Sequence, residues 1–230
     1  MRTSCLSLVW LGVWSVAGIL PLSSVHGEGG RDGTHGFYFR GGIGPAIADK
    51  TDLQEYFGPR SGIQVEYDVG LRISAMGGYQ FGKYFSAELE TGILYNSIKS
   101  ITGSPGIDAS LANVPMLANA VFHIPLESHF APYCGFGLGG SSSIVTFDHA
   151  TILGSVLDGS DADLVWAGQA FAGFRYEFNA RMGVGFGYKY LATAEPSWDV
   201  VSSTSTAGSG QIRFDNARTH SFLAEFSMRF

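Results

Sequence analysis

Hydrophobic and polar residues alternate along most of this chain with a period of two. Between Phe85 and Tyr95 the odd positions are mostly apolar, while the even positions include Glu88, Glu90 and Gly92. Because successive side chains of a β-strand point to opposite faces, this pattern predicts strands with one apolar and one polar face. Eight segments are predicted as strands: 36–48, 64–81, 84–99, 111–124, 130–145, 162–178, 182–194 and 216–230.

The connections between these segments alternate in length. The short ones are 82–83, 125–129 and 179–181, and the long ones, rich in Gly, Ser, Asp and Thr, are 49–63, 100–110, 146–161 and 195–215. An even number of strands with short turns on one side and long loops on the other is typical of a transmembrane β-barrel. We therefore predict an all-β fold, a closed antiparallel eight-stranded up-and-down barrel with short periplasmic turns and four long extracellular loops.

A soluble β-sandwich also produces alternation, because its apolar face packs on a second sheet. Aromatic residues favour the barrel because they gather near both ends of the predicted strands. Those near the short turns are Phe37, Phe39, Phe81, Tyr84, Phe85, Phe130, Phe178, Phe226 and Phe230, and those toward the long loops are Tyr67, Tyr95, Trp166 and Tyr190. Two such bands match the interfacial girdles of a barrel in lipid, and the sandwich stays the alternative.

The first residues have the order of a secretory signal peptide. Arg2 is followed by an apolar run from Leu6 to Leu22 and by the small-residue pattern Val25-His26-Gly27. We predict a signal peptide at 1–27, a short lead at 28–35 and the barrel domain at 36–230; an uncleaved anchor is the alternative. No later run reaches the roughly 18 apolar residues of a spanning helix, so a helical membrane protein is not expected.

Composition supports strands and narrows the partners. The chain has 32 glycines, 13 % aromatic residues and 15 % charged residues, which favours tightly packed strands over helices. The formal net charge of −6, with no basic patch, gives no reason to expect nucleic acid. Once the signal is removed only Cys134 remains, so no internal disulfide is expected.

Two segments resemble the OmpA-like and opacity-type eight-stranded outer-membrane proteins. They are the opening Gly36-Phe37-Tyr38-Phe39-Arg40-Gly41-Gly42 and the final stretch His220 to Phe230 with its alternating aromatics. The resemblance implies a bacterial outer-membrane location, surrounded by outer-membrane lipid and lipopolysaccharide. It also implies delivery by periplasmic chaperones to the barrel-insertion machinery, which would read Phe226 and Phe230 as an insertion signal.

If the apolar face meets lipid, the opposite face lines the lumen. We predict a charge network there, made of Arg40, Arg72, Glu88, Glu90, Arg175, Glu177, Lys189, Glu225 and Arg229. The other polar residues assigned to the lumen are Glu66, Asp68, Gln80, Asn96, Asn113, Asn119, His123 and Gln169. Buried charges need partners, and side chains fill most of an eight-stranded interior, so we expect a plugged lumen rather than a wide pore.

Three groups of residues are candidates for catalysis or metal binding. Lipid A deacylases of this size use a His and a Ser two residues apart, whereas His220 and Ser221 are adjacent and should point to opposite faces. Glu88 and Glu90 share a face and could form an acid and base pair, but partners in the network are the better interpretation. The loop aspartates Asp148, Asp158, Asp161 and Asp163 lack the spacing of a Ca²⁺ loop. No catalytic residue, metal or cofactor is predicted.

The sequence therefore predicts a non-enzymatic outer-membrane barrel that serves membrane integrity or surface interaction through its long loops. The surface ligand is not specified by the sequence. A narrow porin for small solutes is the second interpretation, and an outer-membrane lipid A hydrolase is the third.

Overall fold

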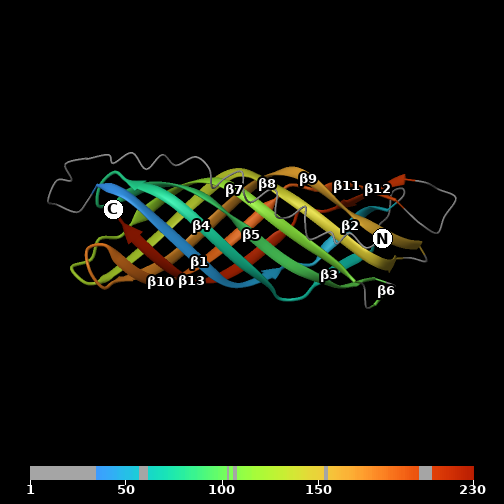
Figure 1. Ribbon diagram of the computed structural model, residues 1–230, viewed down its shortest axis with the longest axis horizontal. Helices are drawn as coiled ribbons and strands as arrows, with labels where there is room; N and C mark the ends of the chain where they lie inside the picture. Colours follow the sequence, from blue (N-terminus) through green and yellow to red (C-terminus); the bar gives the residue numbers. More distant parts are fainter. Residues whose placement is uncertain (1–34, 57–61, 103, 106–107, 153–154, 202–208) are drawn as a thin grey trace, which may run out of the picture. The chain divides into compact units, whose positions relative to one another are not determined.

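The computed structural model describes residues 35–56, 62–102, 104–105, 108–152, 155–201 and 209–230, and its regular structure there is entirely β-strand (Figure 1). The strands are β1 (Gly36–Ala48), β2 (Thr51–Tyr56), β3 (Gln64–Tyr67), β4 (Gly70–Gln80), β5 (Phe85–Ile101), β6 (Ser104–Pro105), β7 (Ala109–His123), β8 (Phe130–Ile152), β9 (Ser155–Glu177), β10 (Met182–Thr193), β11 (Ser197–Val201), β12 (Ser209–Phe214) and β13 (Arg218–Arg229). Over these ranges the chain forms no helix long and apolar enough to cross a membrane. The predicted signal peptide lies outside the described residues.

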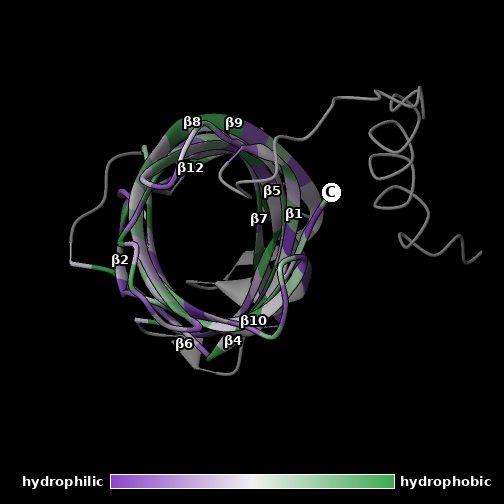
Figure 2. Cartoon of the chain, turned by 90° about the vertical axis from the view of Figure 1, so that its left-hand side faces the viewer, coloured by the Kyte–Doolittle hydropathy of each residue, from purple (hydrophilic) through white to green (hydrophobic). Residues whose placement is uncertain are grey.

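Eight of these strands form a closed antiparallel ring. The pairs around it are β1 with β4, β4 with β5, β5 with β7, β7 with β8, β8 with β9, β9 with β10, β10 with β13, and β13 with β1. Figure 2 looks along this ring from its short-turn end. The first and last strands close it, with Gly42 opposite Glu225 on one side and Ser74 on the other. The predicted closed eight-stranded barrel is confirmed.

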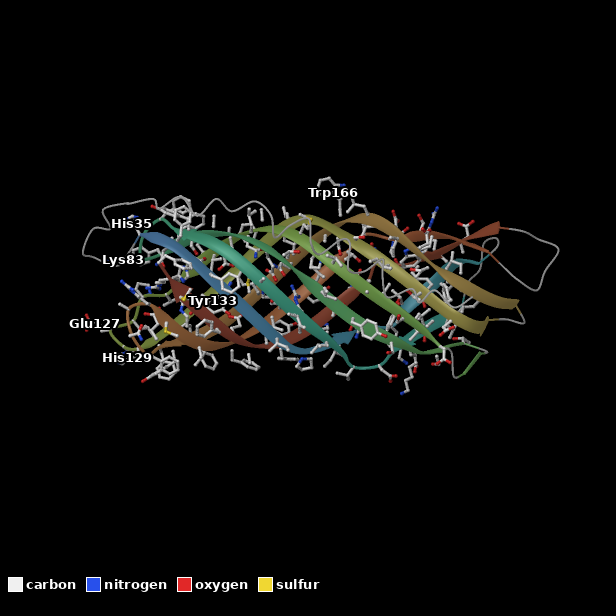
Figure 3. The ribbon with its side chains drawn as sticks, in the orientation of Figure 1. His35, Lys83, Glu127, His129, Tyr133 and Trp166 are labelled. Carbon is white, nitrogen blue, oxygen red and sulfur yellow. The ribbon has the colours of Figure 1, made fainter. Side chains whose placement is uncertain are left out.

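The outer wall is apolar, which is the reverse of a soluble protein. The exposed fractions of Trp166, Leu164 and Leu89 are 80 %, 78 % and 72 %. Trp166 projects away from the wall (Figure 3). So large a continuous apolar surface requires lipid around it, which argues against the sandwich.

An aromatic girdle lies on the outer wall at the short-turn end. Phe37, Tyr79, Phe81, Phe85 and Phe122 form a continuous chain of ring contacts, with centroids 4.9, 5.0, 5.7 and 5.6 Å apart in that order. This band matches the predicted girdle at this end.

Tyr67 does not belong to the girdle predicted at the other end. Its hydroxyl lies 2.6 Å from the Thr51 hydroxyl and its ring packs against the apolar interior, where burial raises the pKa of Tyr67 to about 12.

The long connections also contain short strands, which the sequence did not predict. They contain β2, β6, β11 and β12, and the predicted strand 64–81 divides into β3 and β4. The strands β2, β3, β6, β11 and β12 lie together at one end of the ring, and β8 and β9 are prolonged into the same region (Figure 1). Antiparallel pairing runs from β11 through β12, β2 and β3 to the outer part of β5. We call these five strands, with the outer parts of β5, β7, β8 and β9, the long-loop extension.

Two residues assigned to the lumen lie outside it. The predicted strand is interrupted at Asp68 and Val69, between β3 and β4, and the alternation of β3 is reversed relative to β4: Val65 and Tyr67 face the interior, whereas Leu71 and Ile73 are exposed. Val65 is therefore buried inside, while Glu66 points outward and accepts a hydrogen bond from Lys50 at 2.6 Å. That hydrogen bond holds the pKa of Glu66 below its usual value. Asp68 is likewise exposed, in the interruption between the two strands.

Candidate functional site

The lumen holds the side chains that the sequence singled out, and the first group is built around Arg40. Its Nη2 donates to Glu88 Oε2 at 2.7 Å and its Nη1 to Glu225 Oε2 at 3.4 Å. The guanidinium carbon lies 4.6 Å from the centre of the Tyr133 ring, and the Tyr133 hydroxyl donates to Glu225. Tyr38 donates to Glu88 Oε1 at 2.7 Å. In this group, the Arg40 cluster, two carboxylates from β5 and β13 close on one guanidinium from β1.

The second group, the Glu90 cluster, has the opposite balance of charge. Glu90 Oε1 accepts from Lys189 Nζ at 2.6 Å and from Arg72 Nη2 at 3.0 Å. Its Oε2 accepts from Gln169 Nε2 at 2.6 Å and from Asn119 Nδ2 at 2.8 Å. All five side chains are buried, so one carboxylate balances two cations with the help of two amides. Such charge-assisted bonds are short and strong where water is excluded.

The third group, the Arg175 cluster, lies at the short-turn end. Glu177 Oε1 accepts from Arg229 Nη2 at 2.9 Å and from Arg175 Nε at 3.2 Å. Arg175 is buried, whereas Glu177 and Arg229 are partly open to solvent. The nine residues of the predicted charge network thus divide into three clusters of mixed charge.

Glycines on the inner wall leave room for these long side chains. A Cβ atom at Gly187 would lie 2.8 Å from both Glu225 Oε1 and the Tyr133 hydroxyl. A Cβ at Gly78 would lie 2.6 Å from Tyr38 Cζ. Any larger residue at either position would displace the Arg40 cluster, which explains why glycine recurs inside these strands.

An apolar plug, which sequence reasoning missed, fills the interior of the long-loop extension. Its buried members are Leu53, Val65, Ile98, Ile101, Leu111, Val145, Phe147, Trp198, Ile212 and Phe214. A smaller apolar group consists of Leu94, Leu117, Ala167 and Leu191. The sequence feature that could have predicted part of the plug is the two-residue spacing of Ile212 and Phe214 within a polar segment.

The residues weighed for lipid hydrolysis are not assembled. His220 points outward, where its Nδ1 lies 2.7 Å from the Tyr188 hydroxyl and its Nε2 lies 3.5 Å from Asp49 Oδ1. Ser221 is fully buried on the inner face, and its Oγ has no hydrogen-bond partner among the described residues. The two residues lie on opposite faces, as their adjacency predicted.

The other candidate chemistries have no assembled site either. Glu88 and Glu90 are each bonded within separate clusters, which gives no acid and base pair. Of the loop aspartates, Asp163 accepts a hydrogen bond from the Ser197 backbone N–H at 2.9 Å. The side chain of Asp158 is not among those that the structure describes. No group of three or more His, Cys, Asp or Glu side chains in the described ranges is arranged to hold a metal ion.

Comparison with known proteins points to one family. Residues 17–230 match the family model described as outer membrane protein beta-barrel domain. The crystal structure of OprG from Pseudomonas aeruginosa is similar, with a TM-score of 0.63, 16 % identity, and coverage of 86 % of this chain and 96 % of that one. Neisserial surface protein A is also similar, with a TM-score of 0.53, 16 % identity, and coverage of 84 % and 97 %. No curated protein matches the sequence of this chain.

Proposed function

This chain belongs to the outer membrane protein beta-barrel domain family, and on that premise we propose that it is a non-enzymatic barrel with a closed lumen. It is a protein of the bacterial outer membrane. Its proposed role is membrane integrity or surface interaction through the long-loop extension. Lipid and lipopolysaccharide form its surroundings.

The observation that supports this proposal most is that two separate sets of side chains fill the interior of the barrel, the charge clusters and the apolar plug. Removing one member of a buried ion pair costs about 3–5 kcal/mol, so the Arg40 and Glu90 clusters resist opening. The apolar plug in turn buries a tryptophan and two phenylalanines, whose exposure to water is unfavourable. A solute crossing the barrel would have to disrupt both fillings, which supports a closed barrel over a porin.

The length of the strands supports a role outside the membrane. A tilted strand needs about 9–11 residues to cross a bilayer, whereas β8 and β9 have 23 residues each. The excess lies in the long-loop extension, on the side that faces the cell exterior in this family. There the outer wall has a hollow of about 580 Å³, lined by Tyr95, Lys99, Asp108 and Thr146 among others. The extension therefore offers a shaped polar surface to a partner.

Conductance in planar lipid bilayers tests the closed lumen. The wild type should carry little or no steady current, and Glu90→Ala combined with Trp198→Ala should leak, because the pair breaks both fillings. Glu55→Ala is the control, since Glu55 lies in the extension and only approaches Arg213 at 4.0 Å. A large, stable wild-type conductance that the double substitution leaves unchanged would refute the closed barrel.

Cysteine labelling tests the direction of the extension. In a Cys134→Ser background, Ser160→Cys should react with an impermeant maleimide on intact cells, whereas Ser128→Cys at a short turn should not. Both residues are exposed, so a difference reports the side of the membrane. Labelling of Ser128→Cys alone would reverse the proposed orientation.

One observation favours the second candidate, a narrow channel. No ladder pair joins β9 to β11 within the described residues; instead Asp163 Oδ2 accepts from the Ser197 backbone N–H at 2.9 Å and lies 3.5 Å from its Oγ. A side chain thus replaces strand pairing at this place in the wall. If the lumen is closed, a disulfide between Asp163→Cys and Ser197→Cys should leave solute uptake unchanged. Solute uptake that the disulfide abolishes and a reductant restores would support the channel.

A further inference from the structure

The Arg175 cluster carries an excess of positive charge at the periplasmic end of the lumen. Two guanidinium groups, from Arg175 and Arg229, share the single oxygen Oε1 of Glu177. One carboxylate balances only one of these cations. A third guanidinium, from Arg181 in the β9–β10 turn, lines the same place and has no ion-pair partner among the described side chains.

These groups surround a small hollow that opens at the rim of the barrel. Its volume is about 10 Å³, and its walls include Arg175, Arg181, Ser227 and Arg229. That space accommodates about one water-sized atom. Met182, which also lines it, is exposed on the outer wall, so the hollow lies where the lumen meets the membrane surface.

Arg175 makes the hollow more than a patch of surface charge. Its side chain is only 7 % exposed, and its one acceptor among the described residues is Glu177, reached through Nε. A guanidinium has five N–H donors, so the two Nη groups of Arg175 remain available beside the hollow. An anionic oxygen in the hollow would accept charge-assisted hydrogen bonds from these donors.

We propose that this hollow binds one oxygen of a phosphate group, with the remaining oxygens outside it facing Arg181 and Arg229. Phosphate fits better than carboxylate because its tetrahedral oxygens accept from three guanidinium groups in different directions, whereas a carboxylate offers two coplanar oxygens. The phosphate has two possible sources, a phospholipid headgroup of the periplasmic leaflet and free phosphate. Both share the chemistry that the arginines recognise.

Binding is measured on the barrel purified in a neutral detergent, with inorganic phosphate followed by phosphorus NMR at constant ionic strength. Phosphate should bind saturably and more tightly than acetate or chloride. Arg229→Gln and Arg181→Gln should each weaken binding about tenfold, the loss expected for one charge-assisted hydrogen bond. Arg213→Gln, which removes an arginine at the opposite end, should leave it unchanged.

The competing source is distinguished with dihexanoyl phosphatidylglycerol. Displacement of inorganic phosphate by this short-chain lipid assigns the site to headgroups, and binding of phosphate without displacement assigns it to free phosphate; both outcomes support the hollow as a phosphate site. Arg181→Gln keeps the test valid if Arg229→Gln fails to fold, because Arg181 lies exposed in a turn. The proposal is overturned if acetate binds as tightly as phosphate, if binding does not saturate, or if Arg213→Gln weakens it equally.

Discussion

The indole N–H of Trp198 donates to the backbone carbonyl of Ser143 at 2.9 Å, which ties β11 to β8 inside the long-loop extension. Trp198 is 1 % exposed and meets the Phe214 ring edge to face, with centroids 5.1 Å apart. This side chain therefore joins a short strand of the last predicted loop to the barrel wall. The extension is held together from within, although parts of it are connected by few ladder pairs.

Replacing Trp198 should loosen the extension. Trp198→Ala removes a buried aromatic and should lower the free energy of unfolding by about 3–5 kcal/mol. Trp198→Phe should cost less, but should still lose the hydrogen bond, worth about 1 kcal/mol. Urea unfolding followed by circular dichroism measures both. Trp166→Phe is the control because Trp166 lies on the outer wall; an equal loss there would contradict the assigned role of Trp198.

The sequence was sufficient for the ring of strands and insufficient for what fills it. The bounds of β1 coincide with the predicted 36–48, because long two-residue alternation with one apolar face leaves little freedom. By contrast β11 has five residues and β2 has six, too few for alternation to stand out among Gly, Ser and Asp. Short strands of this kind are stabilised by pairing with neighbouring strands, and a local sequence pattern carries no information about those neighbours.

The ion pairs show the same limit of what the sequence can predict. Alternation places Arg40 and Glu88 on the inner face, but their contact joins residues on strands that are not adjacent, β1 and β5. Which inward side chains meet depends on strand tilt and stagger around the whole barrel. The division into three clusters is therefore a property of the closed ring. The reversal at Glu66 similarly follows from the interruption between β3 and β4 at Asp68 and Val69, which the local pattern does not show.

Glu90 should be more important for stability than any surface acid. Glu90→Gln leaves Arg72 and Lys189 facing each other without a buried counter-charge, and should lower the free energy of unfolding by about 3–5 kcal/mol. Glu55→Gln, whose partner Arg213 is 4.0 Å away and partly exposed, should change it by less than about 1 kcal/mol. Urea titration of both variants in the same detergent gives the comparison. Similar values for the two would show that Glu90 is not the centre of a buried network.

The extension should also respond to alkaline pH. Because burial raises the pKa of Tyr67 to about 12, the neutral phenol is favoured in the folded chain. Unfolded tyrosine ionises at about pH 10. The stabilisation that comes from keeping the Tyr67 phenol neutral and buried is therefore complete below that pH, and it is lost as the pH rises through about 12. The difference in phenolate absorbance between wild type and Tyr67→Phe isolates this group. Ionisation of Tyr67 at its ordinary pH would show that the extension admits water.

At Phe230, the energetic cost of a charge at the membrane interface can be separated from its effect on recognition by the barrel-insertion machinery. Phe230 is 75 % exposed on the outer wall, and a charge near the membrane interface costs only about 0–1 kcal/mol. Phe230→Asp should therefore refold in detergent almost as well as wild type. In cells it should accumulate severalfold less folded, heat-modifiable barrel, because the resemblance to outer-membrane proteins implies that Phe230 belongs to the insertion signal. Phe186→Asp is the matched comparison, since Phe186 lies in the middle of β10 against Phe174 and Phe222, where a charge destabilises the barrel in both settings. Equal amounts of folded wild-type and Phe230→Asp protein in the outer membrane would refute the insertion role, whatever the detergent result.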